Sequence, residues 1–171
     1  MSAPSRFDGA KQQAFRGFGR LPKPLRRFIV HTVSPNWTAG AVAIIERDGR
    51  WLMVNPVYRD GWTLPGGLID RGEAPADAVA RELQEELGLD ADVDETEPWI
   101  LVDSAMRRID LVFHATIADD VDIDAIKIQS PELEAVAWFA KDALPETDRE
   151  AGDVFSLIDQ VLAGGSRVLV R

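Results

Sequence analysis

Cysteine is absent from this 171-residue sequence. Its absence excludes disulfide bonds, thiolate metal sites and cysteine nucleophiles. The sequence also lacks any apolar run that approaches the length of a membrane span, and its N-terminal stretch, MSAPSRFDGAKQQAF, lacks the apolar core of a secretory signal. We therefore expect a cytoplasmic protein with no membrane partner.

Basic residues are also scarce. The sequence contains 19 Lys and Arg and 29 Asp and Glu, which gives a net charge of −10. Residues 1–35 hold seven of the basic residues and one acidic residue, so this segment carries +6 and the remainder −16. An acidic body argues against a nucleic-acid partner. A phosphorylated small molecule would approach it only where bound cations reverse the local sign.

The composition that is present, 46% hydrophobic and 28% charged, is typical of one globular domain of ordinary size. Asp48-Gly49 is a strong hairpin signal between two β-branched, apolar runs. A Thr147-x-x-Glu150 capping box predicts the start of a last helix that runs through about Leu162. The predicted strands cover residues 38–46, 51–55, 99–103 and 109–117.

Residues 1–35 mix basic and apolar side chains, and a short helix is predicted from Leu25 to Val33 with Pro24 near its start. Such a segment can dock on a membrane surface or a partner. The interpretation that we favour is an arm whose apolar side packs on its own domain or on a second subunit, which leaves a homodimer open. The basic cluster of this segment comprises Arg16, Arg20, Lys23, Arg26 and Arg27.

The stretch from Gly66 to Leu89, GGLIDRGEAPADAVARELQEELGL, organises the rest of the chain. Its second half predicts a helix from Pro75 to a stop at Gly88. On this helix three glutamates share one face, separate from an apolar stripe. Like charges one turn apart destabilise a helix, so the cluster needs a reason, and a hard divalent cation with oxygen ligands supplies one. The alternative is a solvated acidic face. The three glutamates are Glu82, Glu85 and Glu86.

The spacing in this stretch favours the metal site. Five residues separate Gly67 from Glu73 and seven more separate Glu73 from Arg81, which Glu82 follows directly. This pattern resembles the Nudix box, G-x5-E-x7-R-E-U-x-E-E-x-G-U with U aliphatic, and matches it at every specified position. The preceding W-x-L-P-G-G and the late segment 132–139, an acidic residue followed by a short strand and Trp, are also similar to this family.

The resemblance implies an α/β fold, the Nudix α/β/α sandwich, in which a mixed β-sheet lies between helices and the box forms a loop–helix unit. It divides the chain into an N-terminal basic arm or helical extension (1–35), a Nudix hydrolase domain (36–163) and a C-terminal tail (164–171). It also implies a pyrophosphohydrolase that acts on phosphorus-containing acid anhydrides. Its reaction would be divalent-metal-dependent hydrolysis, with Mg²⁺ or Mn²⁺, of a nucleoside diphosphate linked to another moiety.

The resemblance also implies site residues. Glu82 and Glu86 are expected as metal ligands, with Glu85 as a further ligand or as the base, and the Gly66 carbonyl matches a metal-ligating position. Arg81 and Glu73 are expected to brace the loop, with Gly67 allowing close approach. Glu132 and Glu134 are candidate bases outside the box. Tyr58, Arg59 and Trp62 are candidate substrate contacts.

Two alternatives stay open on the sequence. Isopentenyl diphosphate isomerases resemble Nudix proteins but depend on a catalytic cysteine, which this chain lacks. A non-catalytic Nudix domain that senses a nucleotide or binds a partner is the competing function, although such domains usually lose box glutamates and this box is complete. Nothing in the sequence selects among a nucleotide sugar, ADP-ribose, a nucleoside triphosphate and a dinucleotide.

Overall fold

The strand at the centre of the sheet, β1 (Thr38–Arg47), is buried from Gly40 to Ile45. Its side chains alternate between the two faces of the sheet, as strand geometry requires. Ala41, Ala43 and Ile45 enter one apolar core, and Val42 and Ile44 enter another. A run that is apolar on both faces is typical of a strand covered on both sides, and this strand is covered on both sides.

The computed structural model describes residues 13–14, 16–33 and 36–171. The sheet is mixed: β1 pairs with β6, and β5 with β8, in parallel, and the other pairings are antiparallel. Its order is β7-β2-β1-β6-β5-β8, with β3 added to β1 and β4 to β6. After β1, the strands are β2 (Arg50–Pro56), β3 (Gly66–Leu68), β4 (Ala91–Val93), β5 (Trp99–Asp103), β6 (Arg108–Ile117), β7 (Leu133–Ala140) and β8 (Val168–Val170), with a 3₁₀ turn η1 (Ile123–Ala125) before β7.

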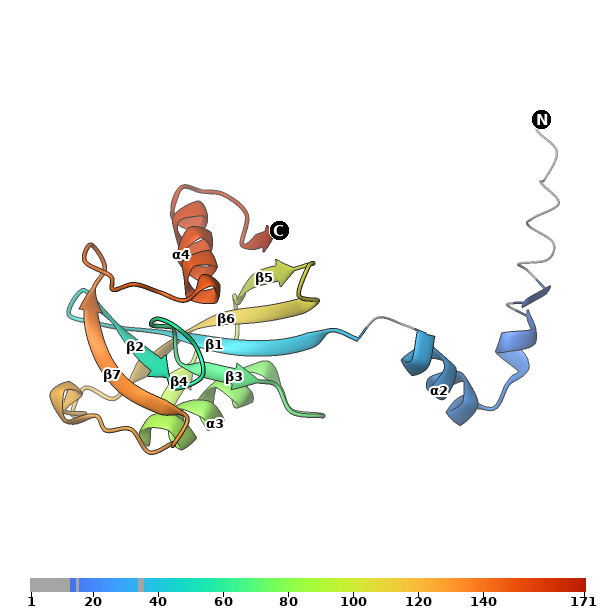
Figure 1. The fold of residues 1–171 in the computed structure, drawn as a ribbon, viewed down its shortest axis with the longest axis horizontal. Coiled ribbons are helices and arrows are strands. Elements are labelled where there is room, and N and C mark those ends of the chain that lie inside the picture. The colour runs from blue at the N-terminus through green and yellow to red at the C-terminus, as the bar shows by residue number, and fades with distance from the viewer. Residues whose placement is uncertain (1–12, 15, 34–35) are drawn as a thin grey trace. The chain divides into compact units, whose positions relative to one another are not determined.

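Two helices cover the two faces of this sheet (Figure 1). α3 (Pro75–Leu87) buries Val79, Leu83 and Leu87 in the core that contains Ala41. α4 (Arg149–Leu162) buries Val154 and Leu157 in the core that contains Val42. The predicted α/β sandwich with a mixed sheet between helices is therefore confirmed.

The predicted strands and the box helix are found close to their expected bounds. Asp48 and Gly49, with φ of 52° and 71°, form the tight turn between β1 and β2, a geometry that Asp-Gly favours. α3 begins at Pro75 with no side-chain cap at Ala74 and ends at Gly88, whose φ is 65°. That left-handed conformation is easy for glycine and ends the helix.

The capping box predicts Thr147 as the N-cap of the last helix, and this prediction is wrong. Asp148, rather than Thr147, caps α4, and its Oδ1 accepts a hydrogen bond of 2.7 Å from the Ala151 backbone N–H. Glu150, which the capping box assigned to the helix start, instead binds two arginines. Aspartate is at least as good an N-cap as threonine, and Asp148 also accepts a hydrogen bond from Arg59.

Three short strands were not expected from the sequence. β3 and β4 add to β1 and β6, and β8 lies within the predicted C-terminal tail, 164–171. β8 runs parallel to β5, and Arg171 after it binds Asp103 at 3.2 Å. Three residues are too few to show a period of two, which is why no pattern revealed them.

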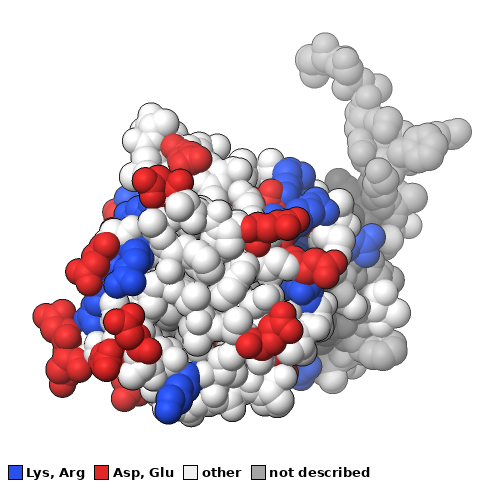
Figure 2. Space-filling view, turned by 60° about the vertical axis from the view of Figure 1, so that its left-hand side comes forward, with Lys and Arg blue, Asp and Glu red and all other residues white. Residues whose placement is uncertain are grey.

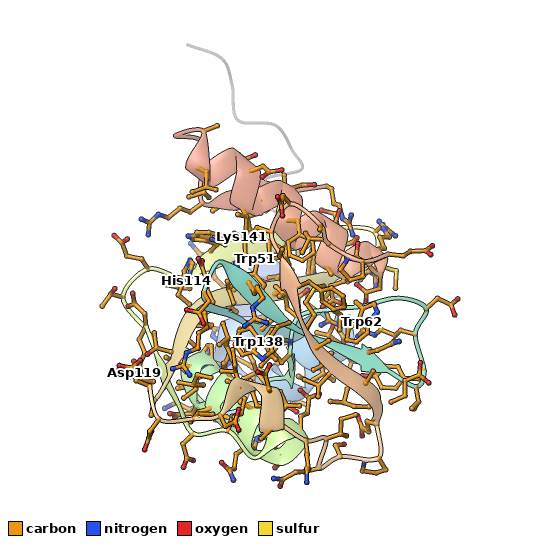
Figure 3. All side chains as sticks on the ribbon, turned by 90° about the vertical axis from the view of Figure 1, so that its left-hand side faces the viewer. Trp51, Trp62, His114, Asp119, Trp138 and Lys141 are labelled. Atoms are coloured by element: carbon orange, nitrogen blue, oxygen red, sulfur yellow. The ribbon has the colours of Figure 1, made fainter. Side chains whose placement is uncertain are left out.

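The tryptophans are mainly packing residues. Trp51 stacks on Phe155 with ring centroids 5.2 Å apart, and the Lys141 ammonium lies 5.3 Å from the Trp51 ring (Figure 3). The Trp138 indole donates a hydrogen bond to the Ile123 carbonyl at 3.1 Å. These contacts join β2 to α4 and β7 to the 3₁₀ turn η1.

The chain forms two units, Met1–Asn36 and Trp37–Arg171. In the first, α2 (Lys23–Val33) confirms the predicted helix, with Pro24 in its first turn and Leu25 and Val30 exposed. The part of the predicted basic arm at residues 1–12, 15 and 34–35 lies outside the described residues. Where the arm packs stays a prediction. Among the described helices, none is long and apolar enough to cross a membrane.

Acidic side chains are distributed over the second unit. On the face shown in Figure 2, they lie around a broad area without charged side chains, and several of them have Lys or Arg beside them. The ion pairs of the second unit include Lys141 with Glu46 and Arg167 with Glu97. The negative charge of this face is therefore spread out.

Gly66→Ala is expected to lower the free energy of unfolding by about 2–5 kcal/mol. The φ of Gly66 is 139°, and a Cβ there would lie 2.3 Å from the Ala41 carbonyl oxygen in the central strand. Backbone strain and overpacking each cost about 1–3 kcal/mol. Gly72→Ala is the matched control, because its φ is 86° and nothing lies within 4 Å. Equal losses for both variants in chemical denaturation would contradict a packing role for Gly66.

Candidate functional site

The loop–helix unit from Gly66 to Leu87 is held against the sheet at its two ends. At the first end, β3 pairs with β1, with Gly66 opposite Val42 and Gly67 opposite Ala41. At the other, the apolar stripe of α3 is buried in the core. The opposite face of α3 is thereby presented to the space beside β3.

Arg81 links this loop to the helix. Its Nε donates to Glu73 Oε1 at 2.9 Å, and its second terminal nitrogen donates to Glu73 Oε2 at 3.2 Å and to the Leu68 carbonyl at 3.1 Å. Glu73 Oε2 also accepts from the Asp70 backbone N–H at 2.9 Å. The hydrogen bonds from Arg81 and Asp70 hold the pKa of Glu73 below its usual value. This two-pronged pair fixes the loop geometry.

Arg81 also contacts two of the helix carboxylates. Its Nη1 lies 2.9 Å from Glu82 Oε1 and 3.5 Å from Glu85 Oε2. The Glu85 side chain is 62% exposed, whereas that of Glu82 is 18% exposed. An exposed i,i+4 pair contributes little to stability, so Glu85 is held weakly and Glu82 more firmly.

The three helix glutamates line one pocket of about 450 Å³. Residues from the sheet and from the loop after β2 complete it, including Gly66 and Gly67 at the box and Tyr58 and Arg59 on the loop. A concave site with convergent polar groups is the expected form of a small-molecule site. The structure thus brings most of the predicted site residues to one cavity.

Glu86 is the most perturbed of these carboxylates. Burial raises its pKa to about 7, and the negative charges of Glu82, Glu132 and Glu85 act in the same direction, against a hydrogen bond from the Gly66 backbone N–H. Its Oε2 is buried and has no hydrogen-bond partner among the described residues. A buried carboxylate oxygen without a partner is costly, and such groups are enriched at functional sites.

This donor set fits a divalent cation. Carboxylate oxygens are the ligands that Mg²⁺ and Mn²⁺ prefer, and a bound cation would offset the burial of Glu86. A Cβ at position 67 would lie 2.3 Å from Glu82 Oε1, so the missing side chain of Gly67 makes room for that carboxylate. Within the described part of the chain, no three Asp, Glu or His side chains are already gathered as a metal cage, and two of the helix glutamates are paired with Arg81 instead.

The candidate residues outside the box divide between the pocket and its surroundings. Glu132 lines the pocket, whereas Glu134 accepts a hydrogen bond from Asn55 at 3.1 Å on the neighbouring strand. Tyr58 is 63% exposed, and the Arg59 guanidinium lies 5.5 Å from its ring. Trp62, labelled in Figure 3, packs edge-on against Phe139 with ring centroids 4.8 Å apart.

Sequence reasoning missed a group of charged residues on the α4 side of the pocket. Arg108 and Glu150 line the pocket together with Arg59. Asp110, only 2% exposed, binds Arg108 Nε with both oxygens at 2.8 Å. One signal was available, because Asp110 is a charge within the apolar run of β6, and buried charges are rarely left without a partner. Nothing in the sequence joined it to Glu150.

The chemistry available at this site follows from these positions. Clustered carboxylates on α3 can hold a cation, and Glu85 and Glu132 supply further proton acceptors at the same cavity. The arginines on the α4 side can bind an anion. Arginines and carboxylates that can hold a cation, gathered around one cavity, suit the hydrolysis of a phosphoanhydride, in which negative charge must be neutralised and a water activated.

Comparisons with known proteins agree with this description. The sequence model of the NUDIX domain matches residues 35–158. A MutT-like protein from Streptomyces ambofaciens is 31% identical over 139 residues, which cover 81% of this chain and 82% of that protein. An RNA pyrophosphohydrolase from Hydrogenovibrio crunogenus is 27% identical over 117 residues, covering 57% of this chain and 69% of that protein.

A solved structure shows the same fold. The crystal structure of the MutT NUDIX hydrolase from Burkholderia pseudomallei matches with a TM-score of 0.60 and 28% identity. The match covers 71% of this chain and 98% of that one. Both the sequence and the fold are therefore similar to this group over most of the second unit.

Proposed function

Because the chain belongs to the Nudix family, we propose that it is a divalent-metal-dependent hydrolase that cleaves the pyrophosphate bond of a nucleoside diphosphate linked to another moiety. The observation that carries this proposal is the buried Glu86 oxygen without a partner, in a pocket that two further box glutamates line. The similarity to an RNA pyrophosphohydrolase supports cleavage at a pyrophosphate.

We assign the cation, Mg²⁺ or Mn²⁺, to the oxygens of Glu82 and Glu86, with the Gly66 carbonyl as a further ligand and Glu85 as either a further ligand or the base. When bound, such an ion neutralises phosphate charge and lowers the pKa of the attacking water. Glu82 and Glu86 lie one turn apart on α3, so their carboxylates can converge. Arg81 and Glu73 hold the loop against the helix. Because Gly67 has no side chain, Glu82 has space beside it.

The proton acceptor for the attacking water is expected among the remaining pocket carboxylates, Glu85 and Glu132. Either can receive a proton at the cavity without being a necessary ligand. Glu134 is the weaker candidate, because it bonds with Asn55 on β2. Tyr58 and Arg59 are proposed to contact the substrate, and the exposed Tyr58 ring offers a surface on which a nucleobase can stack.

A panel of nucleotides tests this proposal. Nucleoside triphosphates, nucleotide sugars, ADP-ribose and dinucleotides are each incubated with Mg²⁺ or Mn²⁺, and the release of phosphate, pyrophosphate or nucleoside monophosphate is measured. We expect turnover of at least one class, complete loss with EDTA and recovery with excess metal. Undiminished turnover in metal-free buffer would contradict metal dependence, and nucleotide binding without turnover would indicate a sensor.

A further inference from the structure

Arg59 and Arg108, called here the arginine pair, are the two cationic side chains among the described residues that line the pocket. They come from distant parts of the sequence, the loop after β2 and the start of β6. Both lie at the beginning of α4, because both contact its first turn. The carboxylates of α3 reach the same pocket from the other face of the sheet.

One carboxylate joins the arginine pair. Glu150 Oε2 accepts from Arg59 Nη1 at 2.7 Å, and Glu150 Oε1 accepts from Arg108 Nη2 at 2.6 Å. Each oxygen of Glu150 thus serves one guanidinium group. All three side chains are partly buried, with 20% exposure for Glu150 and Arg108 and 30% for Arg59, so solvent screens these bonds less than surface pairs.

Each arginine has a second anchor. Asp148 Oδ2 accepts from Arg59 Nη1 at 3.1 Å, while its Oδ1 caps α4. Asp110 binds Arg108 Nε with both oxygens. These bonds keep the guanidinium groups in fixed positions, since charge-assisted forked contacts are strong and directional.

Some nitrogens of the two guanidinium groups remain without an acceptor among the described residues. Among the described residues, the Nε and Nη2 of Arg59 and the Nη1 of Arg108 have no hydrogen-bond acceptor. These nitrogens belong to side chains at the wall of the cavity. A phosphate group accepts several hydrogen bonds from such guanidinium donors.

On the basis of the proposed pyrophosphate hydrolysis, we propose that the arginine pair binds the pyrophosphate group of the substrate from the α4 side, while the box carboxylates act from the α3 side. Glu150 is the positioning residue, because its two oxygens hold the two guanidinium groups side by side at the pocket. Nothing in the box motif specifies this part of the site.

This role is tested by the binding of imidodiphosphate, an analogue of pyrophosphate with a nitrogen bridge. Binding is measured by calorimetry with Mg²⁺ present. Arg59→Lys and Arg108→Lys keep the charge but lose the fork, and we expect each to weaken binding by about 10- to 100-fold. The matched control is Arg107→Lys, one residue away, exposed and outside the pocket. It should bind as the wild type does.

Glu150→Gln tests the positioning role. We expect a similar loss of affinity, and a KM rise with a smaller change in kcat for any nucleotide that the wild type hydrolyses. Arg108→Lys should cost much less in the Glu150→Gln background than in the wild type, because the two act through one contact. If the role of Glu150 were purely structural, Glu150→Gln would lower the melting temperature and leave the affinity for imidodiphosphate unchanged. Arg108→Lys would then weaken binding equally in both backgrounds.

Wild-type affinity in both arginine variants, or no imidodiphosphate binding by the wild type, would overturn the inference even if nucleotides are hydrolysed. Pair-dependent binding without turnover of any nucleotide would instead overturn the proposed hydrolase and leave the arginine pair in place. Should Arg108→Lys fail to fold, Arg59→Lys decides, since Asp148 still caps α4 in that variant.

Discussion

Glu86→Gln is expected to make the metal-free protein more stable at pH 8 and to reduce its turnover by about 10²-fold or more. Burial raises the pKa of Glu86 to about 7 from 4.5. The folded state therefore binds this proton more tightly than the unfolded state does. The stability that the neutral carboxyl allows is fully present below about pH 4.5, and it is lost as the pH rises through about 7.

The expected gain for Glu86→Gln at pH 8 is about 1–3 kcal/mol, because one pKa unit corresponds to about 1.4 kcal/mol and the amide must still satisfy its own donors. Chemical denaturation at pH 4, 6 and 8 measures it. The difference between variant and wild type should be smallest at pH 4 and should grow toward pH 8. A variant that is equally destabilised at all three values would contradict the ionised, buried Glu86.

Two controls sharpen this result. Glu85→Gln changes the same charge on the same helix at a side chain that is 62% exposed, so its effect on stability should be small. Mg²⁺ should stabilise the wild type more than the Glu86→Gln variant, since a ligand that binds only the folded state stabilises it. Stability and activity thus change in opposite directions at Glu86.

The second large effect separates the carboxylates by role. Glu82→Gln and Glu86→Gln are expected to raise the Mg²⁺ concentration for half-maximal rate by about 10–100-fold, the scale on which changes around a metal site act. Replacing the proton acceptor, Glu85 or Glu132, should lower the rate at saturating Mg²⁺ by about 10²–10⁴-fold and leave the metal requirement unchanged. Glu134→Gln is the matched control, because Glu134 bonds with Asn55.

Rate against Mg²⁺ concentration for the five variants, with melting temperatures, provides the measurement. Each Glu→Gln change keeps the side-chain volume, and the three changes on α3 also keep helix propensity, so altered kinetics reflect the carboxylate. If Glu82→Gln and Glu86→Gln kept the wild-type dependence of rate on Mg²⁺, the assignment of Glu82 and Glu86 as metal ligands would be wrong. A loss of rate in Glu134→Gln equal to that in the pocket variants would indicate a global effect.

The box helix was predictable because several local signals agree. Pro75 fits the first turn, Gly88 fits the left-handed stop, and the apolar stripe between them has a period of 3.6. Local propensity and tertiary packing favour the same structure there. β5 was predicted at its bounds for a similar reason, because its apolar run is flanked by turn residues.

The remainder depends on contacts between distant residues. β3, β4 and β8 exist because β1, β6 and β5 offer them an edge, and three residues carry no period of their own. The α4 cap moved from Thr147 to Asp148, a residue that also binds Arg59. Tertiary contacts of this kind leave no mark on the neighbouring sequence.

The arginine pair and Glu150 occupy positions 59, 108 and 150, whereas the box is one uninterrupted stretch of the chain. Substitutions in the three separate segments can accumulate one at a time without disturbing the box helix. The affinity for a pyrophosphate group can therefore change while the box is inherited intact. Under the proposed role of the arginine pair, two proteins with identical boxes need not bind a pyrophosphate group equally well.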